Sequence, residues 1–272
     1  MRYKTVWISD LHLGTRGCDA HGLLDFLRQA DFERLYLVGD VIDLWHLKKN
    51  HYWPQEHNDV VQKILRKARK GAEIIVIPGN HDEFCGNFLG TYGNVTIKTH
   101  DVYTTIAGQR LLVVHGHEFD SVTKHARWLA YLGDVGYTLL LRMNQPLNSV
   151  RRRLGWGYWS LSAYAKSKVK NAVKFISQFE DAVVRYAQLH HADGIVCGHI
   201  HTPALKQIRD LAYYNTGDWV ESSTALVEHF DGSIRLLRWG ETGLEIETES
   251  IPSALDLHDQ SELLVSETEH SV

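Results

Sequence analysis

Five short apolar runs, rich in β-branched residues, occur along the chain at residues 5–8, 34–38, 74–77, 111–114 and 195–197. Uninterrupted runs of this length are typical of strands that are buried on both faces. Helical spacing of apolar residues is clearest between Pro54, which opens a helix, and Gly71, which ends it. Strand and helix therefore alternate, which predicts a layered α/β core. Residues 213–219 and 225–239 predict later strands without intervening helices.

A polar residue able to bind a metal or water follows each of the five runs. In chain order these residues are Asp10, Asp40, Asn80, His115 and His199. In open α/β sheets the ligand crevice lies at the carboxyl ends of the strands, so an active site produces this repeated placement. Histidine is also unusually frequent, with 17 residues in the chain, and its grouping into short motifs favours metal binding. The sequence therefore predicts a metal site at these strand ends.

Residues 121–179 differ in kind from the alternating part of the chain. They hold ten Lys and Arg residues, and Asp134 is their one acid. Residues 128–141 are apolar on nearly every face of a helix, and aromatic residues follow them. We therefore predict a helical, basic and aromatic cap inserted between the fourth and fifth of the strands.

Composition fits a globular core with an insertion. A chain of 272 residues that is 44% hydrophobic and 23% charged, with a net charge of -4, is neither disordered, collagen-like nor a disulfide scaffold. From Glu241 onward the sequence has nine acids and no Lys or Arg, which is typical of a mobile tail. The predicted parts are a core of residues 1–120 and 190–250, a cap of residues 121–189, and an acidic tail of residues 251–272.

The sequence predicts neither a membrane span nor a cysteine framework. No apolar run approaches the ~20 residues that a spanning helix needs, and the N-terminus begins as a strand rather than as a cleavable leader. Cys18, Cys85 and Cys197 are odd in number and widely spaced. We expect neither disulfides nor a structural zinc cluster from them, and we expect the protein to be cytoplasmic.

Five short motifs carry the chemistry. In order they are Asp10-x-His12, Gly39-Asp40-x-x-Asp43, Gly79-Asn80-His81-Asp82, His115-Gly116-His117 and Gly198-His199-x-His201. Together they resemble the calcineurin-like metallophosphoesterases, over roughly residues 2–218. The resemblance implies an α/β fold, a four-layer α/β/β/α sandwich with a helical cap insertion. Imidazole, carboxylate and amide ligands without thiolate suit Mn, Fe, Zn or Co better than copper(I), and so many imidazoles disfavour Mg.

The pattern of the resembling family implies two divalent metal ions, Mn²⁺ before the others. One ion would be held by Asp10, His12, Asp40 and His201. The second would be held by Asn80, His115 and His199, with Asp40 bridging both. Ions ~3.5–4 Å apart can share a hydroxide that attacks phosphorus in line, without a covalent enzyme intermediate. Residues two apart share a face of an extended strand, so we expect Asp10 with His12, and His199 with His201, to converge only on an extended backbone.

His81 and Asp82 are the predicted catalytic residues. In the resembling family this histidine assists the leaving group or binds a phosphate oxygen. We expect the neighbouring carboxylate of Asp82 to hold the ring and to raise its pKa. Asp43 and His117 are expected to orient metal ligands. A non-catalytic scaffold is disfavoured, because such a protein would tolerate the loss of ligands and none is missing here.

The run Gly39-Asp40-x-x-Asp43-x-Trp45 and the helical insertion after His115 look most like the UDP-2,3-diacylglucosamine hydrolases of bacterial lipid A synthesis. This resemblance implies cleavage of a pyrophosphate to UMP and 2,3-diacylglucosamine 1-phosphate. Apolar helices of the cap would sheath acyl chains, and its basic residues would meet the diphosphate. The substrate contacts that we expect are Asp120, Arg151, Lys166 and Lys170.

A different substrate stays open at this point. Many of the lipid enzymes carry Gly-Asn-Arg-Asp, whereas this chain carries Gly-Asn-His81-Asp82, as is more usual in the wider superfamily. The alternative is therefore a phosphodiesterase or phosphatase of another phosphoester. Nucleic acid is not expected, since the chain is acidic overall and lacks a nucleic-acid-binding motif.

Basic residues of the cap also suit an anionic membrane surface. Each charge near such a surface is worth about 1 kcal/mol, and residues 151–153 are three consecutive arginines. This composition suggests peripheral contact with the inner face of the inner membrane. Nothing in the pattern of the chain defines an oligomeric state.

Overall fold

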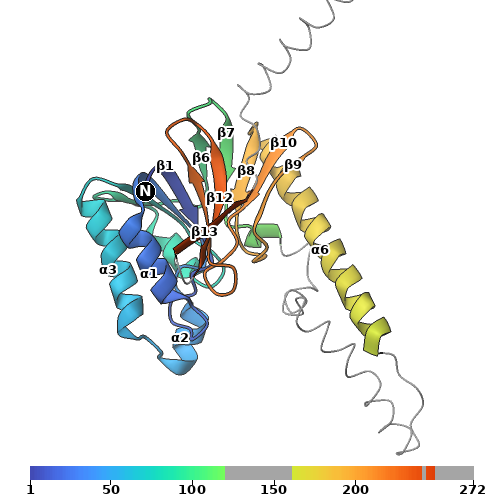
Figure 1. The fold of residues 1–272 in the computed structure, drawn as a ribbon, viewed down its shortest axis with the longest axis horizontal. Helices are drawn as coiled ribbons and strands as arrows, with labels where there is room; N and C mark the ends of the chain where they lie inside the picture. The colour runs from blue at the N-terminus through green and yellow to red at the C-terminus, as the bar shows by residue number, and fades with distance from the viewer. Residues whose placement is uncertain (120–160, 241–242, 249–272) are drawn as a thin grey trace, which may run out of the picture. The chain divides into compact units, whose positions relative to one another are not determined.

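The computed structural model describes residues 1–119, 161–240 and 243–248 (Figure 1). The chain divides into two compact units by its internal contacts. The first consists of Met1–Glu118 and Val183–Val272, and the second is Phe119–Ala182. The metal-ligand motifs all lie in the first unit.

Much of the predicted cap lies outside the described residues, and so does the whole predicted tail, 251–272. Asp120 and Arg151 are among the residues that are not described. The described helix of this region is α6 (Leu161–Leu189), which contains Lys166 and Lys170. The cap and the tail therefore stay predictions.

The larger sheet of the first unit has strands from both ends of the chain. Its strands are β1 (Arg2–Ile8), β2 (Asp31–Val38), β3 (Glu73–Ile77), β4 (Gly90–Tyr92), β5 (Val95–Ile97), β11 (Thr224–Glu228), β12 (Ile234–Gly240) and β13 (Gly243–Thr248). They lie in the order β13-β12-β11-β1-β2-β3-β5-β4. β1, β2, β3 and β5 run parallel, whereas the strands at the two sides pair antiparallel.

The smaller sheet has a parallel centre with one antiparallel strand on each side. Its strands are β6 (Asp101–Thr104), β7 (Arg110–Val113), β8 (Gly194–Cys197), β9 (Ala204–Ile208) and β10 (Leu211–Asn215). They lie in the order β6-β7-β8-β10-β9. β8 pairs parallel with both β7 and β10.

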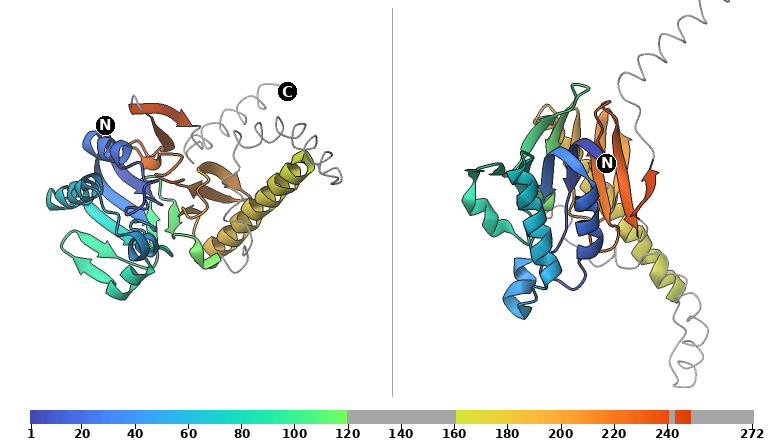
Figure 2. Two further views of the ribbon diagram at one scale, coloured as in Figure 1. Left: turned by 90° about the horizontal axis from the view of Figure 1, so that it is seen from below. Right: turned by 60° about the vertical axis from the view of Figure 1, so that its left-hand side comes forward.

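Two helices cover one face of the larger sheet. They are α1 (Ala20–Gln29) and α3 (Gln55–Arg69), and they lie side by side in Figure 1 and Figure 2. The Asp19 side chain accepts the N–H of Gly22 and so caps the start of α1. Apolar residues at helical spacing, among them Leu23, Leu27 and Ile64, join one buried cluster with residues of the sheet.

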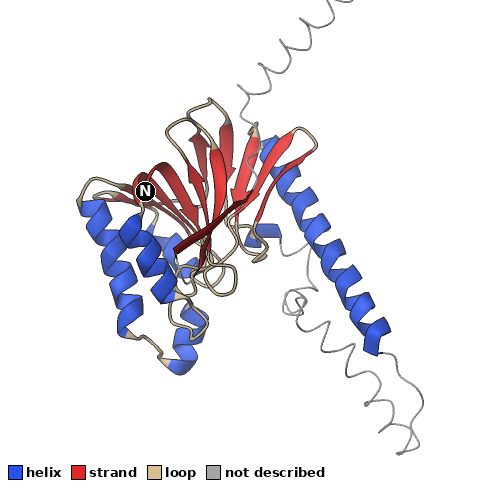
Figure 3. Cartoon of the chain, viewed as in Figure 1, coloured by secondary structure: helices blue, strands red, loops and turns tan. Residues whose placement is uncertain are grey.

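A second buried cluster joins the two sheets. It contains Trp7 and Tyr36 of the larger sheet together with Val113, Val196 and Tyr214 of the smaller one. The sheets therefore pack face to face, and Figure 3 shows their strands with α1 and α3 outside. The predicted α/β sandwich is confirmed. The predicted fourth layer is a helix over the smaller sheet. It stays a prediction, because α6, the described helix of that region, belongs partly to each of the two units.

The predicted elements match closely, with differences in the last third of the chain. The five early strands are β1, β2, β3, β7 and β8, and the helix after Pro54 is α3. The strand predicted at residues 213–219 ends at Asn215, because the chain turns at Gly217, whose φ of 73° suits glycine. Residues 225–239 form a hairpin of β11 and β12. Among the described residues, no helix is long and apolar enough to cross a membrane.

Candidate metal centre

The loops that carry the motifs are hydrogen-bonded to one another. After β1, the backbone N–H of Asp10 donates to the Gly39 carbonyl of the neighbouring loop at 3.0 Å. After β8, the N–H of Gly198 donates to the His115 carbonyl at 3.1 Å. Across the two sheets, the N–H of His199 donates to Asp10 Oδ2 at 2.9 Å. The carboxyl ends of the parallel strands in both sheets therefore meet at one place.

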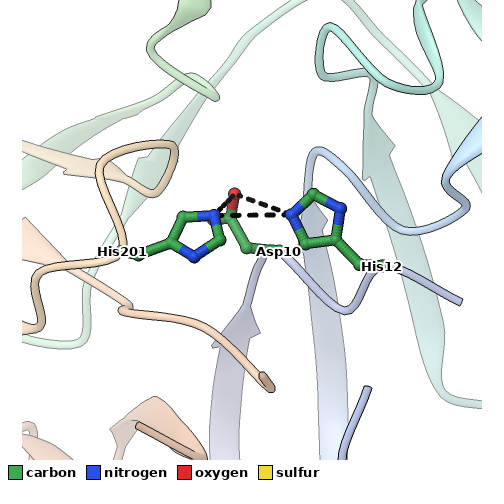
Figure 4. A group of neighbouring side chains, drawn as sticks. All are labelled: Asp10, His12 and His201. Carbon is green, nitrogen blue, oxygen red and sulfur yellow. Dashed lines mark hydrogen bonds and ion pairs between the residues drawn. The ribbon is translucent and has the colours of Figure 1, made fainter. Parts of the chain in front are cut away.

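Asp10, His12 and His201 form the first group of potential metal ligands. Figure 4 shows their side chains pointing toward one another. His201 Nε2 lies 3.2 Å from Asp10 Oδ1 and 3.4 Å from His12 Nε2. His12 Nε2 lies 4.0 Å from Asp10 Oδ1. One carboxylate and two imidazoles at this spacing are suited to a single divalent ion.

Asp40, His115 and His199 form the second group, with ligand atoms within 4.8 Å of one another. Asp40 Oδ2 lies 3.5 Å from His115 Nε2 and 4.0 Å from His12 Nε2 of the first group. Asp40 Oδ1 accepts the backbone N–H of His81 at 2.8 Å. The carboxylate therefore uses one oxygen to hold a loop and turns the other toward both groups.

Several buried polar atoms of the centre have no hydrogen-bond partner among the described residues. They are Asp10 Oδ1, His115 Nε2, both polar atoms of the Asn80 amide, and Nδ1 of both His81 and His117. The other atoms of the first two side chains are occupied, because Ser9 Oγ donates to Asp10 Oδ2 and His115 Nδ1 bonds to the Val38 carbonyl at 2.8 Å. Unpaired buried polar atoms are costly. A donor set of this kind fits divalent metal ions, which satisfy the remaining atoms.

The expectation that Asp10 and His12 converge only on an extended backbone is wrong. Their φ angles are 52° and 48°, and that of His201 is 51°. The left-handed conformation at Asp10 and His12 turns the loop, so that their two side chains meet although the backbone is not extended. Such a conformation is rare outside glycine and costs of order 1–3 kcal/mol at each residue. Strain of this kind is concentrated at functional sites.

Charges within the centre shift the pKa values of its residues. Burial lowers the pKa of the His115 imidazole, but the carboxylates of Asp40 and Asp10 outweigh burial and raise this pKa to about 10. Burial likewise lowers the pKa of His201, whereas Asp10 and Asp218 raise it to about 9. Burial raises the pKa of Asp40, but nearby histidines lower it to about 2. At neutral pH the metal-free centre thus combines ionised carboxylates with cationic imidazoles.

Metal binding is expected to release protons from this centre. A divalent ion held by His115 and His201 would need an unprotonated Nε2 on both, but both rings are protonated at neutral pH because their pKa values are raised. The apparent affinity for Mn²⁺ should therefore rise with pH up to those pKa values, by about tenfold per unit for each proton displaced. Titration with Mn²⁺ at constant pH, with buffer alone as control, measures the release. Binding at neutral pH without proton release would exclude these histidines as ligands.

Asp43, rather than Asp82, lies beside the His81 ring. His81 Nδ1 lies 3.0 Å from Asp43 Oδ2. The carboxylate of Asp82 instead accepts the backbone N–H groups of Gly79 and Val41, both at 2.7 Å. The prediction that Asp82 holds the His81 ring is therefore wrong. Asp82 points back from the start of η1 (Glu83–Phe88) and ties the loop after β3 to the loop after β2.

The His81 ring is held on several sides. Asp43 Oδ2 also lies 3.3 Å from His12 Nδ1, so one carboxylate faces both imidazoles. The His12 ring meets His81 edge to face at 4.8 Å, and the Trp45 ring packs on His81 at 4.3 Å between centroids. His81 Nε2 lies 3.9 Å from Asp40 Oδ2. These contacts direct the free edge of His81 toward the two groups of potential ligands.

A hollow of about 580 Å³ adjoins the loops after β3 and β7. Its lining includes Gly79, Glu83, Phe84, His117 and Glu118. His117 belongs to η2 (His117–Phe119), and its ring centroid lies 5.5 Å from that of His115. Its part in orienting a metal ligand stays a prediction.

Two side chains without a predicted role support the centre. His57, in α3, is 2% exposed, and its Nδ1 accepts the N–H of Gly14 at 2.9 Å, which holds the loop after His12. Asp218 Oδ2 lies 3.9 Å from His201 Nδ1. Both residues are distant in sequence from the motifs that they support. The one local signal was the turn-forming sequence that precedes Asp218.

The fold and the centre agree with a family match. The family model described as Calcineurin-like phosphoesterase matches residues 3–203. The chain therefore belongs to the calcineurin-like phosphoesterases, and it is a hydrolase of a family that implies divalent metal ions. The resemblance inferred from the five motifs is confirmed.

Relatives with more specific names cover most of the chain. UDP-2,3-diacylglucosamine hydrolase of Psychromonas ingrahamii is 24% identical over 224 residues, which are 79% of this chain and 89% of that protein. The hydrolase of the same name from Cellvibrio japonicus is 27% identical over 236 residues, 79% of this chain and 91% of that protein. Among solved structures, the E. coli phosphoesterase Yfce is 16% identical, covers 92% of this chain and 98% of its own, and has a TM-score of 0.47.

Proposed function

We propose that this protein hydrolyses the pyrophosphate of UDP-2,3-diacylglucosamine and releases UMP and 2,3-diacylglucosamine 1-phosphate. The observation that carries the proposal is the meeting of two groups of metal-ligand donors at one carboxylate, Asp40. The names of the relatives support the choice of substrate. The family match supports hydrolysis of a phosphorus–oxygen bond.

The cofactors that we propose are two Mn²⁺ ions, with Fe, Zn or Co as other ions that suit these donors. One ion would be held by Asp10, His12, Asp40 and His201. The second would be held by Asp40, Asn80, His115 and His199. Two such ions supply an activated water molecule and neutralise charge on the phosphoryl oxygens.

His81 is the proposed group that acts on the leaving oxygen. Asp43 Oδ2 lies 3.0 Å from His81 Nδ1 and would hold a proton on that nitrogen. His81 Nε2 is then left to face the substrate, where it binds a phosphoryl oxygen or, when protonated, gives its proton to the leaving oxygen. Trp45 and His12 keep the ring in that orientation. Asp82 acts only by holding the loops.

The rest of the substrate needs surfaces beyond the metal centre. The hollow lined by Glu83, Phe84 and His117 has the size and the mixed polar and aromatic lining of a small-molecule site, and we assign it to a sugar or nucleoside. From the cap, we propose contacts by Asp120, Arg151, Lys166 and Lys170. The basic composition of the cap supports peripheral contact with the cytoplasmic face of the inner membrane.

His81 favours a second candidate, the hydrolysis of another phosphoester. The resemblance described above implies arginine at this position in many of the lipid enzymes, whereas this chain carries His81. A guanidinium offers a fixed charge and a planar fork of donors for a diphosphate, whereas an imidazole offers a proton that it can transfer. A phosphodiesterase or phosphatase is therefore the alternative, acting through the same metal centre.

Product analysis by mass spectrometry separates these two candidates. The purified protein with Mn²⁺ is incubated in parallel with UDP-2,3-diacylglucosamine, UDP-N-acetylglucosamine and bis-p-nitrophenyl phosphate. We expect UMP from the acylated substrate, and no product from the sugar nucleotide without acyl chains at the same concentration. Hydrolysis of the simple diester alone would contradict the lipid substrate and support the alternative. Hydrolysis of none of the three would contradict both.

A further inference from the structure

A buried polar loop lies behind the first group of potential ligands. It runs from Asn215, at the end of β10, to Thr224, at the start of β11, beyond the residues that match the family model. Asn215, Thr216, Asp218 and Thr224 are each at most 1% exposed. A loop with so many buried polar side chains needs internal partners for them, and the partners show how the loop is built.

Asp218 organises the second half of this loop. Its Oδ1 accepts the backbone N–H groups of Val220, Glu221 and Ser222 at 2.8, 2.6 and 3.2 Å. Ser222 Oγ donates to Asp218 Oδ2 at 3.0 Å and lies 3.0 Å from Thr224 Oγ1. One carboxylate oxygen is thus fully used by the backbone, and the other has room for one more partner.

That second oxygen faces a potential metal ligand. Asp218 Oδ2 lies 3.9 Å from His201 Nδ1, while Nε2 of the same ring lies 3.2 Å from Asp10 Oδ1. The imidazole therefore stands between a buried carboxylate and the first group. At 3.9 Å the two atoms are too far apart for a hydrogen bond, so the carboxylate acts on the ring in this structure through its charge.

The first half of the loop supports the other side of the same group. Ser9 Oγ donates to Asp10 Oδ2 and to the Gly217 carbonyl, the latter at 2.9 Å, and lies 2.6 Å from Thr216 Oγ1. The backbone N–H of Trp219 donates to the Asp10 carbonyl at 3.1 Å. One loop therefore supports two members of the first group, Asp10 through Ser9 and His201 through Asp218.

We infer that Asp218 is a positioning residue that fixes His201 with its proton on Nδ1 and thereby sets the affinity of one of the two metal positions. The inference rests on the proposed dinuclear centre. A carboxylate behind a ligating imidazole orients the ring and strengthens it as a ligand, and its removal typically costs about 10–100-fold in metal affinity. In the position formed by Asp40, His115 and His199, the His115 ring is held by the Val38 carbonyl at its Nδ1 and not by Asp218, so we expect the affinity of that position to stay nearly unchanged.

The variant Asp218→Asn tests the inference with little disturbance of the loop. Its amide oxygen keeps the three backbone N–H groups. Its NH₂ group replaces Oδ2 opposite His201 and can donate to Ser222 Oγ, in place of the bond that Oδ2 accepted from that hydroxyl. That NH₂ group is a donor and offers no acceptor to the N–H of Nδ1, so the tautomer that leaves Nε2 for a metal loses its support. The matched control is Asp231→Asn, because Asp231 also accepts the N–H and hydroxyl of a nearby residue, Ser233, but in an exposed turn.

Equilibrium dialysis with Mn²⁺ and elemental analysis gives the two affinities. We expect Asp218→Asn to weaken one of them by about 10–100-fold and to leave the other within about threefold, while Asp231→Asn changes neither. If Asp218 acts through His201, then Asp218→Asn adds no further loss in a His201→Gln background. The inference would be overturned if Asp218→Asn left both Mn²⁺ affinities unchanged or weakened both equally. It would also be overturned if the losses of affinity from Asp218→Asn and His201→Gln were additive in the double variant.

Two further measurements keep the test decisive. The unfolding temperature in chelator shows whether Asp218→Asn folds. If it does not, ¹⁵N-histidine spectra of the wild-type protein loaded with Zn²⁺ report which nitrogen of His201 carries the proton, and a proton on Nε2 would overturn the inference. Wild-type protein that binds fewer than two Mn²⁺ would instead refute the proposed function, which is a distinguishable result.

Discussion

Replacing Asp40 with asparagine is expected to lower kcat/KM by at least about 10³-fold, because metal ions contribute several kcal/mol to the transition state. The amide of the new side chain would keep an oxygen for the His81 N–H, which donates to Asp40 Oδ1 at 2.8 Å. Its NH₂ group would take the place of Oδ2, the atom that faces His115 and His12. The loop is therefore preserved while the atom shared by both metal positions is removed.

This result is measured with the acylated substrate and with bis-p-nitrophenyl phosphate at saturating Mn²⁺, and the bound metal is counted by elemental analysis. Fewer than two bound ions should accompany the loss of activity. The exposed carboxylate variant Asp231→Asn is the control and should keep full activity. Undiminished turnover in Asp40→Asn would contradict a carboxylate shared by two ions.

Replacing His81 with alanine is expected to lower kcat by about 10²–10⁴-fold, the usual contribution of a general acid. The metal content should stay at the wild-type value, because the two proposed metal positions do not use His81. His81 forms a third group of potential ligands with His12 and Asp43, but we assign Asp43 and Trp45 to holding its ring. A variant that loses kcat but keeps its bound metal would show that His81 serves proton transfer and not metal binding.

The control for His81 is an exposed histidine on a helix, His21→Ala in α1, which should behave as the wild type. Steady-state kinetics and elemental analysis on the same samples decide the outcome. If His81→Ala lost bound metal in proportion to activity, then His81 would act as a ligand. If it kept full kcat, another group would serve the leaving oxygen.

The placement of the centre could be predicted because its signal is local. Each apolar run is followed by a residue, such as Asp10 or His115, of a type that can bind metals, and parallel strands bring their carboxyl ends together. The strands that precede these residues could be predicted without knowledge of the tertiary structure, because their apolar runs are unbroken. Strand pattern and motif therefore agreed on where the potential ligands gather.

The partners of the ligands could not be predicted, because nearness in sequence is a poor guide in a tight loop. Asp82 follows His81 directly, yet its carboxylate turns to backbone N–H groups, while Asp43 reaches the ring from another loop. The left-handed backbone at Asp10 and His12 has only a weak signal in residue type, because Asp and His adopt it more often than most residues but still rarely. Asp218 reaches His201 only because a loop between two strands of different sheets folds behind it.

The substrate contacts are the least determined by sequence. Charge and helical pattern in residues 121–179 predict a basic cap, but a run of lysines such as 166, 168 and 170 passes around a helix rather than along one face. Composition therefore indicates an anionic partner without selecting which side chains meet it. Metal ligands are more predictable, because coordination restricts both residue type and position.

Anomalous diffraction from crystals grown with Mn²⁺ tests the central claim, a dinuclear centre built on Asp40, most directly. We predict two manganese peaks ~3.5–4 Å apart with Asp40 Oδ2 between them. Asp10, His12 and His201 should surround one peak, and Asn80, His115 and His199 should surround the other. A single peak, or two peaks without Asp40 between them, would contradict the account.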